Sequence, residues 1–143
     1  MKRKTMFIIA TSVILVLLIA VYCFFWLRPV YAKDVLEMDQ WAEVTSSCLF
    51  GYNEILMPIT LDELVEILDH HQLSRMEDLR GISVPAIYIQ MQRKDGVPVQ
   101  LTISEDGQVT YTIYPFDPDR RETTTWNDKS GEMYGAVKKH PSN

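Results

Sequence analysis

The stretch PAIYIQMQRKDGVPVQLTISEDGQVTYTI, residues 85–113, decides the fold of this chain. It contains three short segments in which the odd-numbered side chains are apolar and the even-numbered ones are mostly Gln or Thr. Such a period of two is typical of a strand with one buried face. The segments are separated by two pairs that favour tight turns, because glycine adopts a positive φ without strain: Asp95-Gly96 and Asp106-Gly107. The stretch therefore predicts a three-stranded antiparallel meander whose odd-numbered side chains form the core.

The segment ITLDELVEILDHHQL, residues 59–73, precedes the meander and predicts a helix over about Leu61 to Gln72. Thr60 and Glu63 have the spacing of a capping box, which satisfies backbone N–H groups at the start of a helix. Apolar side chains recur at helical spacing on one face, at Leu61, Leu64, Val65, Ile67 and Leu68. We expect this face to pack against the meander.

The remaining segments predict shorter elements. Strands are expected over Trp41–Phe50, Glu54–Ile59 and Glu122–Trp126. Ser74 is expected to cap a short helical turn, and Ser130 a last helix from Gly131 to Lys139. This order predicts an α+β domain over residues 41–140, in which an antiparallel β-meander packs against one main helix and a short C-terminal helix. The polar end of the chain, Lys138 to Asn143, is expected to fray, with residues 141–143 as the tail beyond the domain.

Residues 6–27, MFIIATSVILVLLIAVYCFFWL, form an apolar run without charge. The run is long enough for the roughly 30 Å hydrocarbon core of a bilayer at about 1.5 Å per helical residue. Residues 1–5 contain Lys2, Arg3 and Lys4, so the positive-inside rule places this start in the cytoplasm. The run predicts a signal-anchor helix in the plasma membrane, followed by a linker over residues 28–40 and a domain outside the cytoplasm.

A cleaved signal peptide is the alternative, because Val30-Tyr31-Ala32 has the small or branched residues of a cleavage site. Cleavage after Ala32 would release the domain as a secreted protein. The apolar run is longer than the roughly 7–15 residues usual in a signal peptide, which favours a retained anchor. Both outcomes export the chain from Lys33 onward.

The net charge of the chain is −5, and it is near −8 without the three basic residues of the start. An acidic domain repels phosphate backbones, which argues against nucleic acid as a partner. Cys48 is the only cysteine outside the apolar run, so an internal disulfide is excluded for the domain. We expect a buried, inert thiol at this position.

The paired candidates for a metal site are His70 and His71, because Glu66 lies four residues before His70 and would share a helix face with it. No second His or Cys cluster supplies a further ligand, and His side chains also suit a helix C-terminus. Carboxylates between Asp117 and Asp128 lack the spacing of an EF-hand, and no nucleophile motif is visible. We therefore predict no catalytic residue, no metal site and no cofactor.

Two tyrosines, Tyr88 and Tyr114, interrupt the polar side of the predicted meander among Gln and Thr. A tyrosine on an open face keeps apolar area in water together with a polar tip that a partner can use. If the two rings are adjacent, they form a candidate interaction face for an envelope protein. The alternative is that the last helix covers this face of the sheet.

The chain resembles the small uncharacterised membrane-anchored extracytoplasmic α+β domains of Gram-positive bacteria. The resemblance rests on residues 59–73 before a meander with Asp-Gly turns, and it carries over no functional residue. The leading hypothesis is a non-enzymatic, membrane-tethered interaction or sensing domain. The alternatives are a small envelope hydrolase or metal-dependent enzyme, and an inhibitor or immunity protein acting on an envelope enzyme. A deep cleft at His70 and His71 would favour the enzyme, and a flat aromatic sheet face would favour binding.

Overall fold

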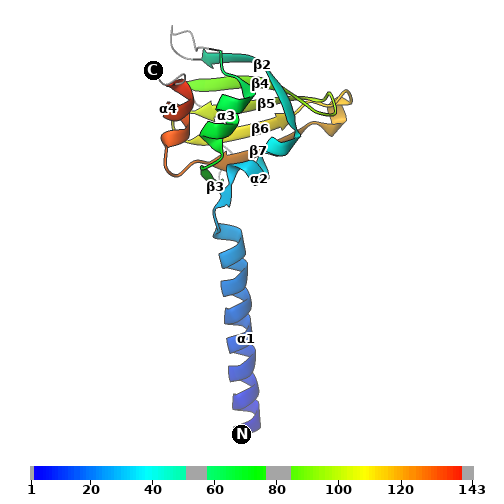
Figure 1. Ribbon diagram of the computed structural model, residues 1–143. Coiled ribbons are helices and arrows are strands. Elements are labelled where there is room, and N and C mark those ends of the chain that lie inside the picture. Colours follow the sequence, from blue (N-terminus) through cyan, green and yellow to red (C-terminus); the bar gives the residue numbers. More distant parts are fainter. Residues whose placement is uncertain (1, 51–57, 77–84, 140–143) are drawn as a thin grey trace.

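The computed structural model describes residues 2–50, 58–76 and 85–139, and it shows an apolar helix that leads into one α+β domain (Figure 1). Helix α1 (Lys2–Leu27) is long and apolar enough to cross a membrane, and it extends away from the domain. The hydroxyl groups of Thr11 and Ser12 donate to carbonyls one turn earlier, at 2.8 and 2.9 Å, so both are satisfied within the helix. At the end of α1, the Arg75 guanidinium lies 4.1 Å from the centre of the Trp26 ring and connects the helix to the domain.

The domain is built on a sheet that, within the described residues, has seven strands paired antiparallel in the order β1-β3-β7-β6-β5-β4-β2. The strands are β1 (Val30–Tyr31), β2 (Trp41–Phe50), β3 (Gln72–Arg75), β4 (Ala86–Arg93), β5 (Pro98–Ser104), β6 (Gln108–Ile113) and β7 (Glu122–Asn127). The predicted meander is confirmed as β4, β5 and β6, and two further predicted strands are confirmed as β2 and β7. The strand predicted over Glu54–Ile59 lies largely outside the described residues.

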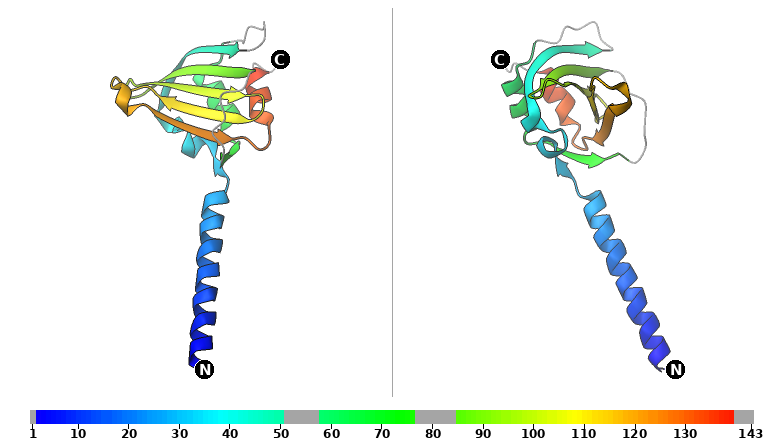
Figure 2. Two further views of the ribbon diagram at one scale, coloured as in Figure 1. Left: turned by 180° about the vertical axis from the view of Figure 1, so that it is seen from behind. Right: turned by 90° about the vertical axis from the view of Figure 1, so that its right-hand side faces the viewer.

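Helices α3 (Leu61–Leu68) and α4 (Glu132–Lys138) cover one face of the sheet, and the short helix α2 (Ala32–Val35) lies at the end nearest α1 (Figures 1 and 2). Two 3-10 turns are η1 (Met38–Gln40) and η2 (Pro118–Arg120). The core joins the buried side of both helices to the odd-numbered side chains of the meander, through Leu64, Leu68, Met133 and Val137. The α+β class and the predicted core face are therefore confirmed.

Both predicted Asp-Gly turns are present, and in each of them the glycine has a positive φ, 85° at Gly96 and 94° at Gly107. The Asp side chain of each turn accepts a hydrogen bond from a backbone N–H two residues on, at 3.1 Å for Asp95 and 3.3 Å for Asp106. A side chain at position 107 is excluded for a second reason, since a Cβ there would lie 2.7 Å from the carbonyl oxygen of Asp128. These turns fix the register of the meander.

The stretch 28–40, for which we predicted a linker, is instead folded, and the domain begins at about Val30. Strand β1 pairs with β3, and the N–H of Ala32 donates to the carbonyl of His71 at 2.9 Å. The stretch contributes three side chains to the hydrophobic core: Ala32, Leu36 and Met38. Between them Lys33 and Asp34 are exposed and Glu37 is half-buried, and these charges are why the composition of the stretch suggested a linker.

Helix α3 begins as predicted but ends at Leu68, one turn before the predicted end. Its capping box is confirmed, because the Thr60 hydroxyl accepts from the Glu63 N–H at 3.3 Å and the Glu63 carboxylate accepts from the Thr60 N–H at 2.9 Å. The chain leaves the helix because the next residues form β3, which is inserted between β1 and β7. Ser74 does not cap a helical turn as predicted, since it lies buried in this strand, and the rest of the predicted turn lies largely outside the described residues.

The cap of α4 also differs from the prediction. Gly131 occupies the N-cap position with a φ of 68°. The Ser130 hydroxyl accepts from the N–H of Glu132 at 3.2 Å, so Ser130 shares the predicted capping role with the buried carboxylate of Asp128. This carboxylate accepts from the N–H and the hydroxyl of Ser130, at 3.2 and 2.6 Å, and from the N–H of Met133 at 2.9 Å. Asp128 therefore ties the end of β7 to the start of α4.

Two aromatic side chains, Trp41 and Tyr111, meet inside the core. The indole N–H of Trp41 donates to the Tyr111 hydroxyl at 3.2 Å. Burial raises the pKa of Tyr111 above its ordinary value, while this hydrogen bond acts in the opposite direction. These rings stabilise the fold and are not available as a recognition surface.

Candidate functional site

Tyr88 and Tyr114 lie on the face of the sheet opposite to α3 and α4, called here the outer face and turned toward the viewer in the left view of Figure 2. Tyr88 is paired with Thr102, whereas the N–H of Tyr114 donates to the carbonyl of Pro98. These two positions on β5 are about 13 Å apart along the strand. Both tyrosine side chains are half-buried. The two rings therefore do not form one aromatic patch.

The outer face is only partly open to solvent. Thr102, Thr110 and Thr112 are at most 9% exposed. Gln90 is exposed, and Gln92 and Gln100 are partly exposed. The expectation of an open surface rich in Gln and Thr is therefore correct for these glutamines and wrong for these threonines.

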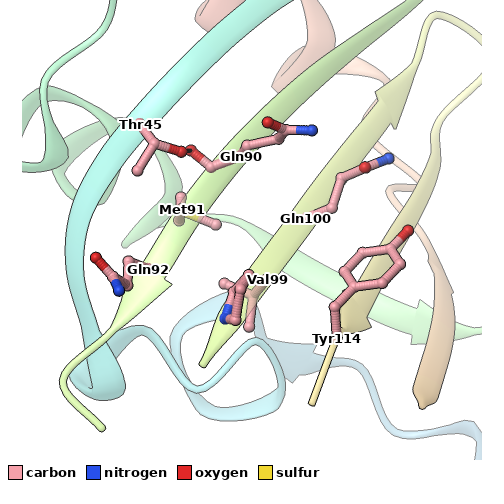
Figure 3. A pocket seen from close by; sticks show the side chains of 8 residues that line it. Thr45, Gln90, Met91, Gln92, Val99, Gln100 and Tyr114 are labelled. Atoms are coloured by element: carbon pink, nitrogen blue, oxygen red, sulfur yellow. Dashed lines mark hydrogen bonds between the residues drawn. The ribbon is translucent and has the colours of Figure 1, made fainter. Parts of the chain in front are cut away.

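A groove of about 570 Å³ crosses the exposed end of the outer face (Figure 3). It is lined by residues of β2, β4 and β5 and by the residue that follows β6: Thr45, Gln90, Met91, Gln92, Pro98, Val99, Gln100 and Tyr114. We call it the glutamine groove. Its volume lies within the range of about 300–1,000 Å³ usual for ligand sites. Among the residues that the structure describes, none of the lining side chains carries a charge.

Each glutamine of the groove is held by one hydrogen bond within the protein. The Ser46 hydroxyl donates to Gln90 Oε1 at 3.1 Å. The Nε2 atom of Gln92 donates to a turn carbonyl, and that of Gln100 donates to the Thr102 hydroxyl, both at 3.3 Å. The other end of each amide makes no hydrogen bond to the described residues. The groove therefore presents the unused N–H₂ group of Gln90 and the unused amide oxygens of Gln92 and Gln100.

The ring of Tyr114 stands beside Gln100 in the groove (Figure 3). The guanidinium of Arg121 lies 4.7 Å from the centre of this ring. Such a cation–π contact contributes about 0.5–1 kcal/mol at an exposed site and holds the ring in place. An aromatic surface thus lies next to the oriented amides.

A second cleft, of about 390 Å³, lies at His70 and His71. The Nδ1–H of His71 donates to the carbonyl of Ile67 at 2.7 Å, because a carbonyl oxygen can only accept. Ser130 also lines the cleft, but its hydroxyl donates to Asp128 and not to either histidine. Within the described residues, the cleft therefore contains no paired nucleophile and base.

In the parts of the chain that the structure describes, no group of three His, Cys, Asp or Glu side chains converges as metal ligands do. The helix expected to align Glu66 with His70 ends at Leu68, before the histidine. At the second cluster of carboxylates, Asp117 accepts from the N–H of Asp119 at 3.1 Å, as a turn residue does.

Cys48 is exposed, contrary to the buried thiol that we predicted. It lies on β2, which is an edge strand among the described residues, so in that part of the chain its outward side chains have a neighbouring strand on one side only. The pairing of β2 with β4 is irregular between Trp41 and Glu43 and between Val44 and Ser46. Such irregularities hinder the addition of a further strand to an edge.

Reasoning from the sequence identified Tyr114 but not its neighbours in the groove. The available signal was three glutamines at even-numbered positions of two consecutive strands, Gln90, Gln92 and Gln100. These side chains form a site only because β2 pairs with β4, where the Thr45 hydroxyl donates to the carbonyl of Gln90 at 3.0 Å. The pairing of distant strands is not visible in a local pattern.

Comparisons of the chain with protein families, with curated proteins and with solved structures found no significant match. The geometry of the groove and of the cleft is therefore the basis on which a function is proposed.

Proposed function

We propose that the protein is a single-pass membrane protein whose domain lies outside the plasma membrane and acts as a non-enzymatic interaction or sensing domain, binding its ligand in the glutamine groove. The groove carries this proposal, because it is open, of suitable volume and lined by oriented polar groups beside an aromatic ring. A retained α1 confines the possible ligands to the cell envelope.

Retention of α1 is supported by the structure around the alternative cleavage site. Ala32 is fully buried, and its N–H donates to the carbonyl of His71. The two residues before it form β1, which pairs with β3. Cleavage after Ala32 would remove β1 from the sheet, whereas a signal peptide is not part of the mature fold.

The cleft at His70 and His71 supports a hydrolase as the second candidate, since Ser130 and Lys129 also line it. The Ser130 hydroxyl is engaged by Asp128 at 2.6 Å in the cap of α4, and this structural role accounts for the contact. The groove offers unused hydrogen-bonding groups instead, so binding is the better supported function. The irregular edge at β2 gives less support to an inhibitor that adds a strand to its target.

A membrane-impermeant maleimide is expected to label Cys48 in intact cells, because this thiol is exposed and the proposed topology places it outside. Cys23 lies within the apolar segment of α1, where the bilayer would cover it. The Cys48→Ser variant serves as the control and should remain unlabelled. Labelling of the unchanged protein only after the membrane is broken would contradict the topology.

Binding in the groove is tested with a photo-cross-linking side chain in living cells. We expect the Gln100→benzoylphenylalanine variant to form a defined cross-linked product, because position 100 lies in the groove. Thr123→benzoylphenylalanine is the matched control, since Thr123 is exposed in the same row of paired residues but lies outside the groove. Identical products from both positions, or none from position 100, would argue against a ligand in the groove.

A further inference from the structure

Resting on the proposed function, we infer that the glutamine groove binds a neutral saccharide chain. The inference combines a lining whose described residues are all uncharged, the amides of Gln90, Gln92 and Gln100, and the ring of Tyr114. These features concern, in turn, the charge of the ligand, its hydrogen-bonding groups and its apolar surface.

The charge of the groove distinguishes neutral ligands from anionic and cationic ones. Two cationic groups lie near the groove but are not among its lining residues: Arg121 lies against the Tyr114 ring, and Arg93 pairs with Glu37 and Asp95 at 3.3 Å each. A phosphate or carboxylate ligand is bound through charge-assisted hydrogen bonds from Arg or Lys, and the lining provides neither. An ammonium ligand needs carboxylates or several aromatic rings, and the lining contains one ring. The groove therefore suits a neutral ligand.

The unused ends of the amides indicate a ligand that both donates and accepts hydrogen bonds. Gln90 offers N–H donors, whereas Gln92 and Gln100 offer carbonyl oxygens. A hydroxyl group can do both, so neighbouring hydroxyls of one ligand can satisfy all three amides. Because each amide is already held by a bond within the protein, less side-chain entropy is lost when the ligand binds.

The ring of Tyr114 offers the groove an apolar surface that matches the apolar face of a sugar. A pyranose ring has an apolar C–H face and a rim of hydroxyl groups, so it can bury that face on an aromatic ring while its rim reaches polar groups. In the groove the Tyr114 ring stands next to the amide of Gln100, which permits both contacts to one sugar unit (Figure 3). The groove is open to solvent, so a saccharide chain can enter it.

The position of the groove separates it from the membrane surface. It is lined mainly by β2, β4 and β5. In the strand order these lie toward one edge of the sheet, whereas β1, the strand that directly follows α1, lies at the other edge. Lipid headgroups are therefore not adjacent to the groove when α1 spans the bilayer. A peptide that adds a strand is disfavoured by the irregular pairing of β2. A saccharide chain of the envelope remains as the occupant that fits both the chemistry and the place.

The test uses the full chain in lipid nanodiscs, titrated with neutral tetrasaccharides of glucose and of N-acetylglucosamine and with tetragalacturonate as a charged chain of the same length. We expect at least one neutral chain to bind with a Kd of about a millimolar or tighter, and the charged chain to bind at least about tenfold more weakly. Tyr114→Ala and Gln100→Leu should each weaken binding at least about tenfold. Tyr114→Phe, which keeps the ring, and Thr123→Ala, outside the groove, should bind within about threefold of the unchanged protein.

Thermal melting of each variant shows whether a loss of binding reflects a loss of fold. Equal or tighter binding of tetragalacturonate, or unchanged binding by both groove variants, would overturn the inference. Failure of both neutral chains to bind would overturn it as well. If the cross-link from position 100 to a protein is nevertheless observed in cells, the proposed function stands and the saccharide alone is excluded; if that cross-link is also missing, both are lost.

Discussion

The Leu64→Ala variant is expected to lower the free energy of unfolding of the domain by about 2–5 kcal/mol, because the lost side chain leaves a cavity that its neighbours fill only in part. Leu64 is fully buried in α3 and belongs to the core that joins both helices to the sheet. The measurement is urea unfolding of the fragment 28–143, followed by circular dichroism. This fragment contains the whole hydrophobic core, which extends from Ala32 to Val137.

Two changes on the same helix serve as controls for this effect. Glu66→Ala alters an exposed side chain and should change the free energy of unfolding by no more than about 0.5 kcal/mol. Thr60→Ala removes the hydroxyl that accepts from Glu63 at the start of α3 and should cost about 1 kcal/mol. If Leu64→Ala proves as mild as Glu66→Ala, the assignment of the buried face of α3 is wrong.

The parts of the fold that could be predicted are those that depend on local signals. Alternation from Ile87 to Ile113, two Asp-Gly turns and one capping box were sufficient to predict β4, β5, β6 and the start of α3. Each of these signals lies within a few residues of the structure that it specifies. Elements of this kind form the centre of the sheet and the main helix above it.

The parts that were missed depend on contacts between distant segments. Strands β1 and β3 have two and four residues, too few for a period of two to appear in the sequence. They are strands because they pair with one another and, through β3, with β7. The cap at Asp128 and the lining of the groove have the same origin, since both depend on which strands become neighbours. Tyr88 and Tyr114 lie on the same face of the sheet, but they lie beside different positions of β5, Thr102 and Pro98, and are therefore not adjacent.

A fragment that begins at Lys33, the product of cleavage after Ala32, is expected to be less stable than the fragment 28–143 by about 2–4 kcal/mol. The shorter fragment lacks the pairing of β1 with β3, the hydrogen bond from the Ala32 N–H to His71 and the buried methyl group of Ala32. For a domain whose total stability is of the order of 5–15 kcal/mol, this loss is large. The measurement is urea unfolding of both fragments at one pH and salt concentration.

A fragment that begins at Val30 separates the contribution of β1 from a general effect of shortening the chain. It retains β1 and Ala32, so its free energy of unfolding should lie within about 0.5 kcal/mol of that of the fragment 28–143. If the fragment from Lys33 is equally stable, β1 is dispensable and the structural support for a retained anchor disappears. The mass of the protein isolated from membranes shows independently whether α1 is retained, because cleavage after Ala32 would remove the mass of residues 1–32.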